Sequence, residues 1–85
     1  MEIAFSLKAN EELESLKKSG NSAILKRLRL ILESIKTTPF HGIGKPEPLE
    51  GNLAGFWSRR ITKEHRLVYK VEKEVVTVVQ VKYHY

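Results

Sequence analysis

The strongest alternation of apolar and polar residues runs through residues 53–69. Aromatic and β-branched residues flank the polar run 62–64, which predicts two strands joined by a tight turn. A loop of three or five residues places Arg60 opposite Arg66, whereas a slip by one residue would mix apolar and charged side chains on both faces. One face then carries Trp57, Arg59, Ile61, Leu67, Tyr69 and Val71, and the other carries Phe56, Ser58, Arg60, Arg66, Val68 and Lys70.

A further strand is predicted over residues 75–82, which are rich in valine. A three-residue turn at 72–74 would pair Val71 with Val75. In that register Val75, Thr77, Val79, Val81 and Tyr83 join the Trp57 face, and Val76, Val78, Gln80, Lys82 and His84 join the arginine face. The sheet therefore has one apolar face that needs a cover and one face that gathers basic residues.

Two helices are predicted in the first half of the chain, after a short alternating strand at residues 2–6. Residues 8–19 favour a helix with a narrow apolar stripe, and Gly20 suits its left-handed C-terminal cap. Asn21 or Ser22 can cap the second helix, which ends before Thr38-Pro39. The apolar stripes are Ala9, Leu13 and Leu16 in the first helix, and Ile24, Leu28, Ile31 and Ile35 in the second, widened by Leu25 and Leu32.

The segment from Pro39 to Asn52 is expected to be an irregular but ordered loop, because it holds all three prolines and three of the five glycines. The predicted fold class is α+β, in the order strand, helix, helix, strand, strand, strand. Both helices pack on the Trp57 face of a twisted, mainly antiparallel four-stranded sheet. The long loop rims the opposite, open face, and residues 1–85 form a single domain.

The amino-acid composition excludes several classes of protein. The chain is 41% hydrophobic and 29% charged, as in globular proteins, and it contains no cysteine for a disulfide or a Cys-based zinc site. It begins without the features of a signal peptide and lacks a run of about 18 apolar residues, so a cytoplasmic location is expected. The net charge of +5 suits a polyanionic partner but does not identify one.

Glu47 lies between two prolines, which restrict it to an extended conformation and aim its side chain from a stiff segment. The alternative is an ordinary exposed loop glutamate. Arg60 and Arg66 lack acidic partners in the predicted register, and a phosphate could bridge their guanidinium groups. The alternative is a solvated basic face with ion pairs to Glu50 or Glu64. Arg59 falls on the core face and is expected to reach an edge, or to sit at a bulge.

The chain ends in Tyr83-His84-Tyr85. A penultimate histidine is usually part of a solvated tail, but the apolar strand before it could hold His84 in place. His41 and His65 are weaker candidates, in a loop and a turn. Three histidines without ligand spacing predict no metal site.

The second half of the chain closely resembles the YoeB branch of the RelE-like toxins. The resemblance rests on Gly-Lys-Pro-Glu-Pro-Leu at 44–49, Asn-Leu-Ala-Gly-Phe-Trp-Ser-Arg-Arg-Ile-Thr at 52–62, Glu-His-Arg-Leu-Val-Tyr at 64–69 and the terminal Tyr-His-Tyr. It implies a ribosome-dependent messenger-RNA endoribonuclease of a type II toxin–antitoxin pair, which cuts messenger RNA in the ribosomal A site. Glu50 stands where the resemblance would imply a basic residue.

The resemblance also implies the roles of residues. Glu47 would be the general base, His84 the general acid, Arg66 the stabiliser of the reacting phosphate, and Tyr85 part of the same site. The substrate-binding positions would be Lys45 and Arg60, and we add Lys82 from its predicted place on the arginine face. The ribose 2′-hydroxyl would attack the adjacent phosphate, so no metal or cofactor is required.

The partners implied are messenger RNA, the 70S ribosome and a YefM-like antitoxin, with a homodimer also allowed and no membrane. Two other readings stay open: a non-catalytic RNA-binding module, and a toxin of the RelE fold that acts on DNA gyrase. The hypothesis of catalysis requires the side chains of Glu47 and His84 to lie close together at a cationic pocket on the open face.

Overall fold

The computed structural model describes residues 1–82, and its five strands form one sheet in the order β1-β5-β4-β3-β2. The α+β class and the order of the predicted elements are confirmed, but the sheet has five strands rather than four. The additional strand is β2, two residues within the segment predicted to be irregular. The elements are β1 (Glu2–Phe5), α1 (Leu7–Lys18), α2 (Ser22–Thr37), β2 (Glu47–Pro48), the 3-10 helix η1 (Gly51–Leu53), β3 (Trp57–Arg60), β4 (Arg66–Glu72) and β5 (Val75–Gln80).

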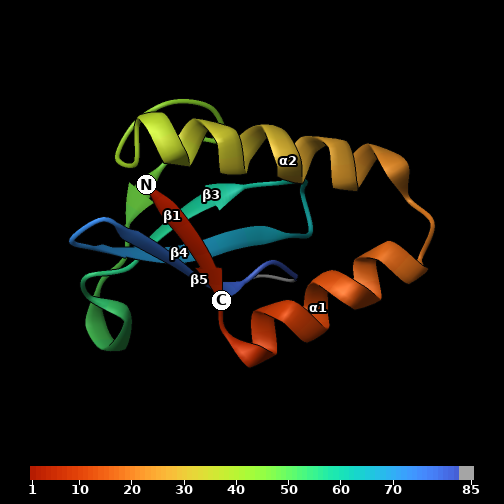
Figure 1. Cartoon of the computed structure of the whole chain (residues 1–85), viewed down its shortest axis with the longest axis horizontal. Helices are drawn as coiled ribbons and strands as arrows, with labels where there is room; N and C mark the ends of the chain where they lie inside the picture. Colours follow the sequence, from red (N-terminus) through yellow and green to blue (C-terminus); the bar gives the residue numbers. More distant parts are fainter. Residues whose placement is uncertain (83–85) are drawn as a thin grey trace.

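The N-terminal strand β1 pairs in parallel with β5, while the other three strand pairs are antiparallel. The chain can reach this parallel position because α1 and α2 form the crossover between β1 and the rest of the sheet. Figure 1 shows the two helices joined by a short turn, with β1 beside β5. Within residues 1–82, no helix combines the length and the apolar character needed to cross a membrane.

Both helices begin at polar caps. The Ser6 side chain accepts a hydrogen bond from the Ala9 amide at 3.1 Å, and Asn21 accepts one from Ile24 at 3.2 Å. Gly20 adopts φ +74°, which allows the tight reversal between the helices.

The helices cover the Trp57 face of the sheet, as predicted. Most residues of the predicted helical stripes are buried or half-buried against the strands in one apolar cluster. Its fully or nearly fully buried members are Ala9, Leu16, Leu28, Ile31, Ile35, Ile61, Leu67, Tyr69, Val76, Val78 and Val81. Neither α1 nor α2 therefore covers the other face of the sheet.

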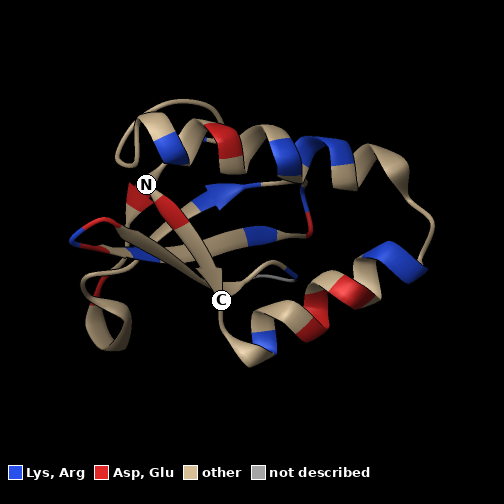
Figure 2. Cartoon of the chain, in the orientation of Figure 1, with Lys and Arg blue, Asp and Glu red and all other residues tan. Residues whose placement is uncertain are grey.

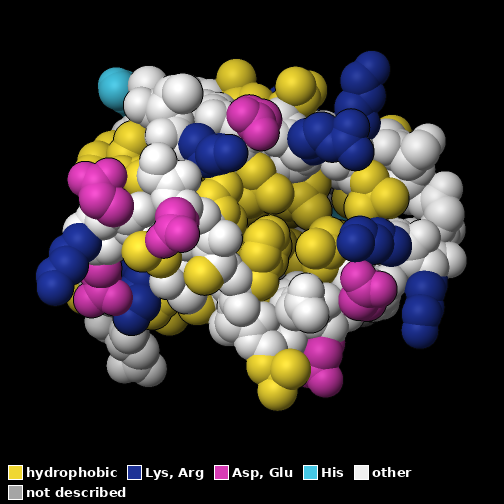
Figure 3. Space-filling view, in the orientation of Figure 1, with side chains coloured by type: hydrophobic (Ala, Val, Ile, Leu, Met, Phe, Trp, Pro, Cys, Tyr) yellow, Lys and Arg dark blue, Asp and Glu magenta, His cyan; other side chains and the backbone are white. Residues whose placement is uncertain are grey.

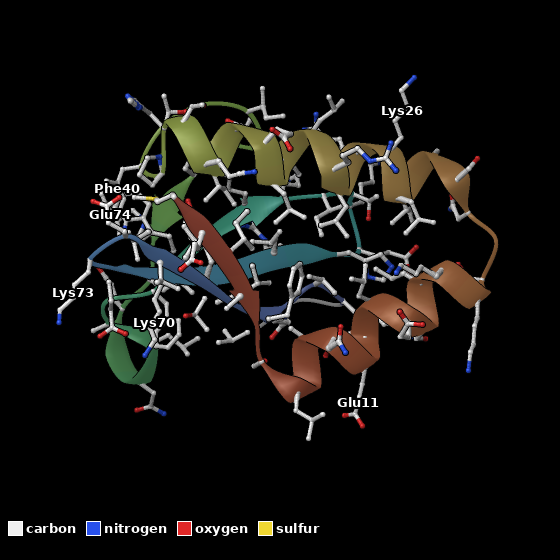
Figure 4. All side chains as sticks on the ribbon, in the orientation of Figure 1. Glu11, Lys26, Phe40, Lys70, Lys73 and Glu74 are labelled. Atoms are coloured by element: carbon white, nitrogen blue, oxygen red, sulfur yellow. The ribbon has the colours of Figure 1, made fainter. Side chains whose placement is uncertain are left out.

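The register of the first predicted hairpin is confirmed: Trp57 pairs with Tyr69, and Arg60 with Arg66. The second hairpin differs from the prediction. Its turn contains two residues, Lys73 and Glu74, so that Val71 pairs with Val76 instead of Val75. Lys73 adopts φ +56°, an unusual conformation for a residue with a side chain, and points away from the sheet at the hairpin tip (Figure 4).

The shorter turn reverses the faces of the first half of β5. Val76 and Val78 lie in the core, whereas Val75, Thr77 and Val79 do not belong to the buried cluster, contrary to the prediction. A β-bulge opposite Val68 and Tyr69 then adds one residue to β5. The side chains after the bulge therefore point to the faces that were predicted for them. Gln80 therefore pairs with Val68 on the arginine face, and Val81 is fully buried in the core.

The revised register can be tested with two neighbouring valines. We expect Val76→Thr to lower the free energy of unfolding by about 1–3 kcal/mol, because it buries a hydroxyl group among apolar side chains without a hydrogen-bond partner. The matched change Val75→Thr should cost less than about 0.5 kcal/mol, since this position is partly exposed on the opposite face. Urea unfolding of the two variants measures the difference. Equal costs, or a larger cost at Val75, would contradict the register.

Candidate active site

Glu47 is held on the open face of the sheet by the short strand β2. It pairs directly with Ser58 of β3, so its side chain shares a face with Ser58, Arg60 and Arg66. Pro46 and Pro48 on either side favour the extended backbone that this pairing requires. Glu47 therefore projects from a paired strand and not from an irregular loop.

Arg66 contacts Glu47 directly. Its Nη1 lies 3.0 Å from Glu47 Oε1 and donates a second hydrogen bond to Ser58 Oγ at 3.2 Å. The expectation that Arg66 lacks an acidic partner is therefore wrong. The Glu47 side chain remains 51% exposed and that of Arg66 14% exposed, so the pair is accessible from solvent.

Arg60 and Lys45 lie beside this pair. Arg60 is exposed on β3, directly opposite Arg66, and its side chain forms no ion pair with an acidic residue within residues 1–82. Lys45 is exposed two residues before Glu47 and adopts φ +51°. Figure 2 shows basic residues on the neighbouring strands β3 and β4, which add positive potential around the carboxylate.

Lys82 extends toward α1. Its ammonium group hydrogen-bonds Ser15 Oγ at 2.8 Å, and the preceding Val81 amide donates to Glu12 Oε1 at 2.9 Å. These contacts attach the end of the described chain to the helical layer. The predicted positions His84 and Tyr85, like Tyr83, lie outside the described residues, so the predicted convergence of Glu47 and His84 stays a prediction.

The two remaining histidines lie in loops, as expected. His41 is exposed, whereas His65 is nearly buried in the turn between β3 and β4. The Thr62 hydroxyl accepts hydrogen bonds from the amides of Glu64 and His65, which fixes this turn. Across residues 1–82, no three histidine or acidic side chains gather in a way that could hold a metal ion.

Arg59 is completely buried on the core face, so the expectation that it reaches an edge or sits at a bulge is wrong. Its guanidinium group contacts α2 and the segment that follows it. The acceptors are Tyr69 Oη (3.1 Å), Ser34 Oγ (2.7 Å), and the carbonyl oxygens of Thr38 (2.5 Å), His41 (3.0 Å) and Ile43 (3.1 Å). Residues 38–43 are thus fastened to β3 by one side chain.

Tyr69 extends the same network. Its hydroxyl group accepts from Arg59 Nε and donates to the Pro39 carbonyl oxygen at 2.6 Å. Burial raises the pKa of Tyr69, and the hydrogen bond and positive charge of Arg59 oppose this rise without cancelling it. The neutral hydroxyl is therefore the form that the fold stabilises.

The roles of Arg59, Tyr69, Ser34 and Ser58 were not predicted from the sequence. One signal was available for Arg59: strand parity assigns it to the apolar face, where a guanidinium group requires several acceptors. The glycine- and proline-rich segment beside it offers unpaired backbone carbonyls. The identity of those carbonyls depends on the path of the loop, which the pattern of the sequence does not specify.

A shallow apolar groove lies between α1 and α2, on the face opposite Glu47 and Arg66. Its lining residues are Leu13, Lys17, Leu25, Leu28, Arg29 and Leu32. Figure 3 shows apolar side chains exposed between the two helices, with basic side chains at their margin. None of these lining residues is acidic, so the groove holds no ion pair like that of Glu47 and Arg66.

Comparison with known proteins identifies close relatives. Residues 5–85 match the profile of the family described as YoeB-like toxin of bacterial type II toxin-antitoxin system. A Synechocystis protein named Toxin YoeB is 47% identical over 66 residues, which cover 78% of this chain and 77% of the relative.

Solved structures agree over the whole chain. A structure described as a YoeB/ParE toxin from Agrobacterium tumefaciens superposes with a TM-score of 0.95 at 38% identity and covers 100% of both chains. YoeB in a YoeB-YefM complex from Staphylococcus aureus gives a TM-score of 0.89 at 41% identity, covering 100% of this chain and 98% of the other. A YoeB dimer from the same organism gives 0.90 at 40% identity, with the same coverage.

The buried network predicts how stability depends on Tyr69. We expect Tyr69→Phe to lower the free energy of unfolding by about 1–3 kcal/mol at pH 8, because Arg59 Nε and the Pro39 carbonyl lose their partner. The raised pKa of Tyr69 means that the unfolded chain ionises first. The wild type should then lose this contribution as the pH rises above about 10 and through the pKa in the folded state.

The difference in the free energy of unfolding between wild type and Tyr69→Phe should therefore become smaller between pH 8 and pH 11. Urea unfolding at several pH values measures it, and each comparison at one pH removes the contribution of the other titrating groups. A difference that stays constant or widens with pH would contradict the assignment.

Proposed function

Because this chain belongs to the YoeB-like toxins of bacterial type II toxin–antitoxin systems, whose known activity is ribosome-dependent cleavage of messenger RNA, we propose that it cuts messenger RNA in the ribosomal A site with Glu47 as the general base. The observation that carries this proposal is the contact of 3.0 Å between the Glu47 carboxylate and Arg66 on the open face. It joins a proton acceptor and a phosphate-binding cation in one accessible site.

In the proposed reaction Glu47 accepts the proton of the ribose 2′-hydroxyl, whose oxygen attacks the adjacent phosphorus. Arg66 stabilises the negative charge that develops on the phosphoryl oxygens. His84 protonates the leaving 5′-oxygen, with Tyr85 in the same site. The products are a 2′,3′-cyclic phosphate and a 5′-hydroxyl end, so each proton removed by the base is matched by one delivered by the acid.

The substrate is held by the basic residues around the pair. Arg60 and Lys45 are exposed beside it and would bind backbone phosphates, and Lys82 is a further candidate. The reaction needs no metal, since a carboxylate, a guanidinium and an imidazole supply the proton transfers and charge stabilisation. It requires a 2′-hydroxyl, so DNA is not a substrate. The ribosome would contribute by positioning the message.

The proposed protein partners follow from relatives. We propose that a YefM-like antitoxin inhibits this chain, as a YoeB-YefM complex of S. aureus is known. It would cover the basic face or displace the C-terminal residues. A homodimer is also proposed, because a S. aureus YoeB forms one.

The catalytic roles can be tested by substitution. We expect Glu47→Gln and His84→Gln each to lower cleavage by about 10²-fold or more, because each removes one proton transfer. The measurement is the rate of messenger cleavage on programmed ribosomes, together with mapping of 5′ ends after brief induction in cells. A message with 2′-deoxyribose at the cleaved position should stay intact.

Glu50→Gln is the matched control for Glu47→Gln, since it removes an exposed carboxylate from the same segment and should cut within about threefold of wild type. Because the Glu47 side chain is 51% exposed and glutamine can still accept a hydrogen bond from Arg66, Glu47→Gln should change the free energy of unfolding by about 1 kcal/mol or less. Full toxicity from a folded Glu47→Gln, His84→Gln double variant would reject both roles. RNA binding without any cut in the wild type would instead indicate a non-catalytic binding module.

The position of the antitoxin can be tested by charge reversal. If it covers the basic face, Arg60→Glu should weaken its binding several-fold and reduce the salt dependence of the affinity. Lys73→Glu makes the same charge change at the exposed hairpin tip and should leave the affinity nearly unchanged (Figure 4). Calorimetry at two salt concentrations measures both. Equal affinities for the two variants would favour displacement of the C-terminal residues.

A further inference from the structure

We propose that Arg59 is a positioning residue for the general base, and that it acts by fixing the segment that delivers Glu47 to the open face. This inference rests on the proposed function, because it concerns the same reaction. Arg59 itself is fully buried and lies on the face of the sheet opposite Glu47, so it does not touch the substrate.

Arg59 uses all of its hydrogen-bond donors inside the fold. A guanidinium group carries five N–H donors in a rigid planar arrangement. The structure provides five acceptors within 3.1 Å, of which three are carbonyl oxygens of residues 38–43. A buried charge costs free energy unless it is fully hydrogen-bonded. Any displacement of the segment would leave part of this charge unsatisfied, so the interaction selects one path for the loop.

The segment held by Arg59 leads within a few residues to Glu47. The Gly44 carbonyl accepts a hydrogen bond of 2.7 Å from the amide of Arg60, the residue after Arg59. Lys45 then adopts a left-handed conformation, φ +51°, and Pro46 leads directly into Glu47. Only three residues separate Ile43, the last residue whose carbonyl group binds Arg59, from Glu47 of β2. A shift of the anchored segment is therefore transmitted to the position of Glu47.

The loop approaches Arg59 closely at two glycines. Gly42 has φ +124°, and a Cβ atom there would collide with Ser34 Oγ and lie 3.2 Å from Arg59 Nη1. Gly44 has φ +82°, and a Cβ atom there would lie 3.2 Å from Arg59 Cβ. Both positions need glycine because the backbone rests directly on the Arg59 network.

These observations predict that disturbing the network lowers the rate of cleavage without abolishing substrate binding. Arg59→Lys keeps the charge but supplies only three donors in a different geometry. We expect it to lower the single-turnover cleavage rate on programmed ribosomes by about 10–10²-fold, the usual effect of misplacing a catalytic group by about 1 Å. The toxin concentration that gives half the maximal rate should change by less than about threefold.

A second variant disturbs the same segment without altering Arg59. Gly42→Ala should lower the rate in the same way, because its methyl group would collide with Ser34. Gly20→Ala is the matched control, since Gly20 also has a positive φ, of +74°, but an added Cβ would contact nothing within 4 Å. It should retain the wild-type rate. The Gly42→Ala variant decides the matter if Arg59→Lys does not fold.

The decisive measurement places each change in the Glu47→Gln background. If Arg59 acts through Glu47, neither Arg59→Lys nor Gly42→Ala should lower the residual rate further by more than about twofold. A further loss equal to that in the wild-type background would overturn the inference, because it would indicate a general effect on the fold. Amide exchange at Arg60, which should accelerate in both variants, reports the loosened loop directly.

Failure of the inference differs from failure of the proposed function. If Glu47→Gln is inactive but both network variants cut at the wild-type rate, Arg59 has no positioning role and the assignment of the base stands. If Glu47→Gln cuts at the wild-type rate, the assignment of the base is wrong and the inference falls with it.

Discussion

The structure depends most on one buried guanidinium group. Arg59 is enclosed by the apolar core but has no carboxylate partner within residues 1–82, so its charge is balanced by oriented dipoles. Three of its acceptors are backbone carbonyls, and one of these belongs to Thr38, the C-terminal cap of α2, where the helix dipole favours a cation. The same bonds connect the helical layer to the sheet and to the loop that carries the proposed base. Stability and the geometry of the site are therefore linked at this residue.

Side chains along β3 point alternately to the two faces of the sheet, so consecutive residues have different roles. Arg59 faces the core and fastens the loop, whereas Arg60 faces the open side and is free to meet a polyanion. Ser58 and Arg66 share the open face with Glu47, while Trp57 and Tyr69 contribute to the core. The sheet thereby separates an apolar face, covered by helices, from a polar face available to a substrate.

The sequence was most informative where local periodicity and burial agree. The apolar stripe from Ile24 to Ile35 predicted α2. For β3 and β4, a register slipped by one residue would place apolar and charged side chains on the same face, so only one pairing was acceptable. It was least informative where backbone geometry departs from common preferences. Lys73 adopts a left-handed conformation without being glycine or asparagine, so the two-residue turn carries no usual signal. The predicted register was wrong between the turn and the bulge in β5. The extra residue at the bulge then returns the following side chains to their predicted faces, so Gln80 and Val81 were assigned correctly. The network of Arg59 could not be predicted because three of its five acceptors are backbone carbonyls, which every residue possesses.

The difference between Arg59 and Arg66 explains how two arginines in one small domain can serve unlike purposes. All five donors of Arg59 are engaged in a buried network, so recruiting it for a substrate would expose several buried carbonyls at a large cost. Arg66 instead keeps 14% of its side chain exposed and pairs with a carboxylate that is 51% exposed, so the pair can be reached from solvent. In the proposed reaction an RNA phosphate would replace Glu47 as the partner of Arg66, so that the guanidinium group keeps an anionic partner. The exchange would bring the phosphate to the cation and leave the Glu47 carboxylate beside it, available to accept the proton of the attacking hydroxyl.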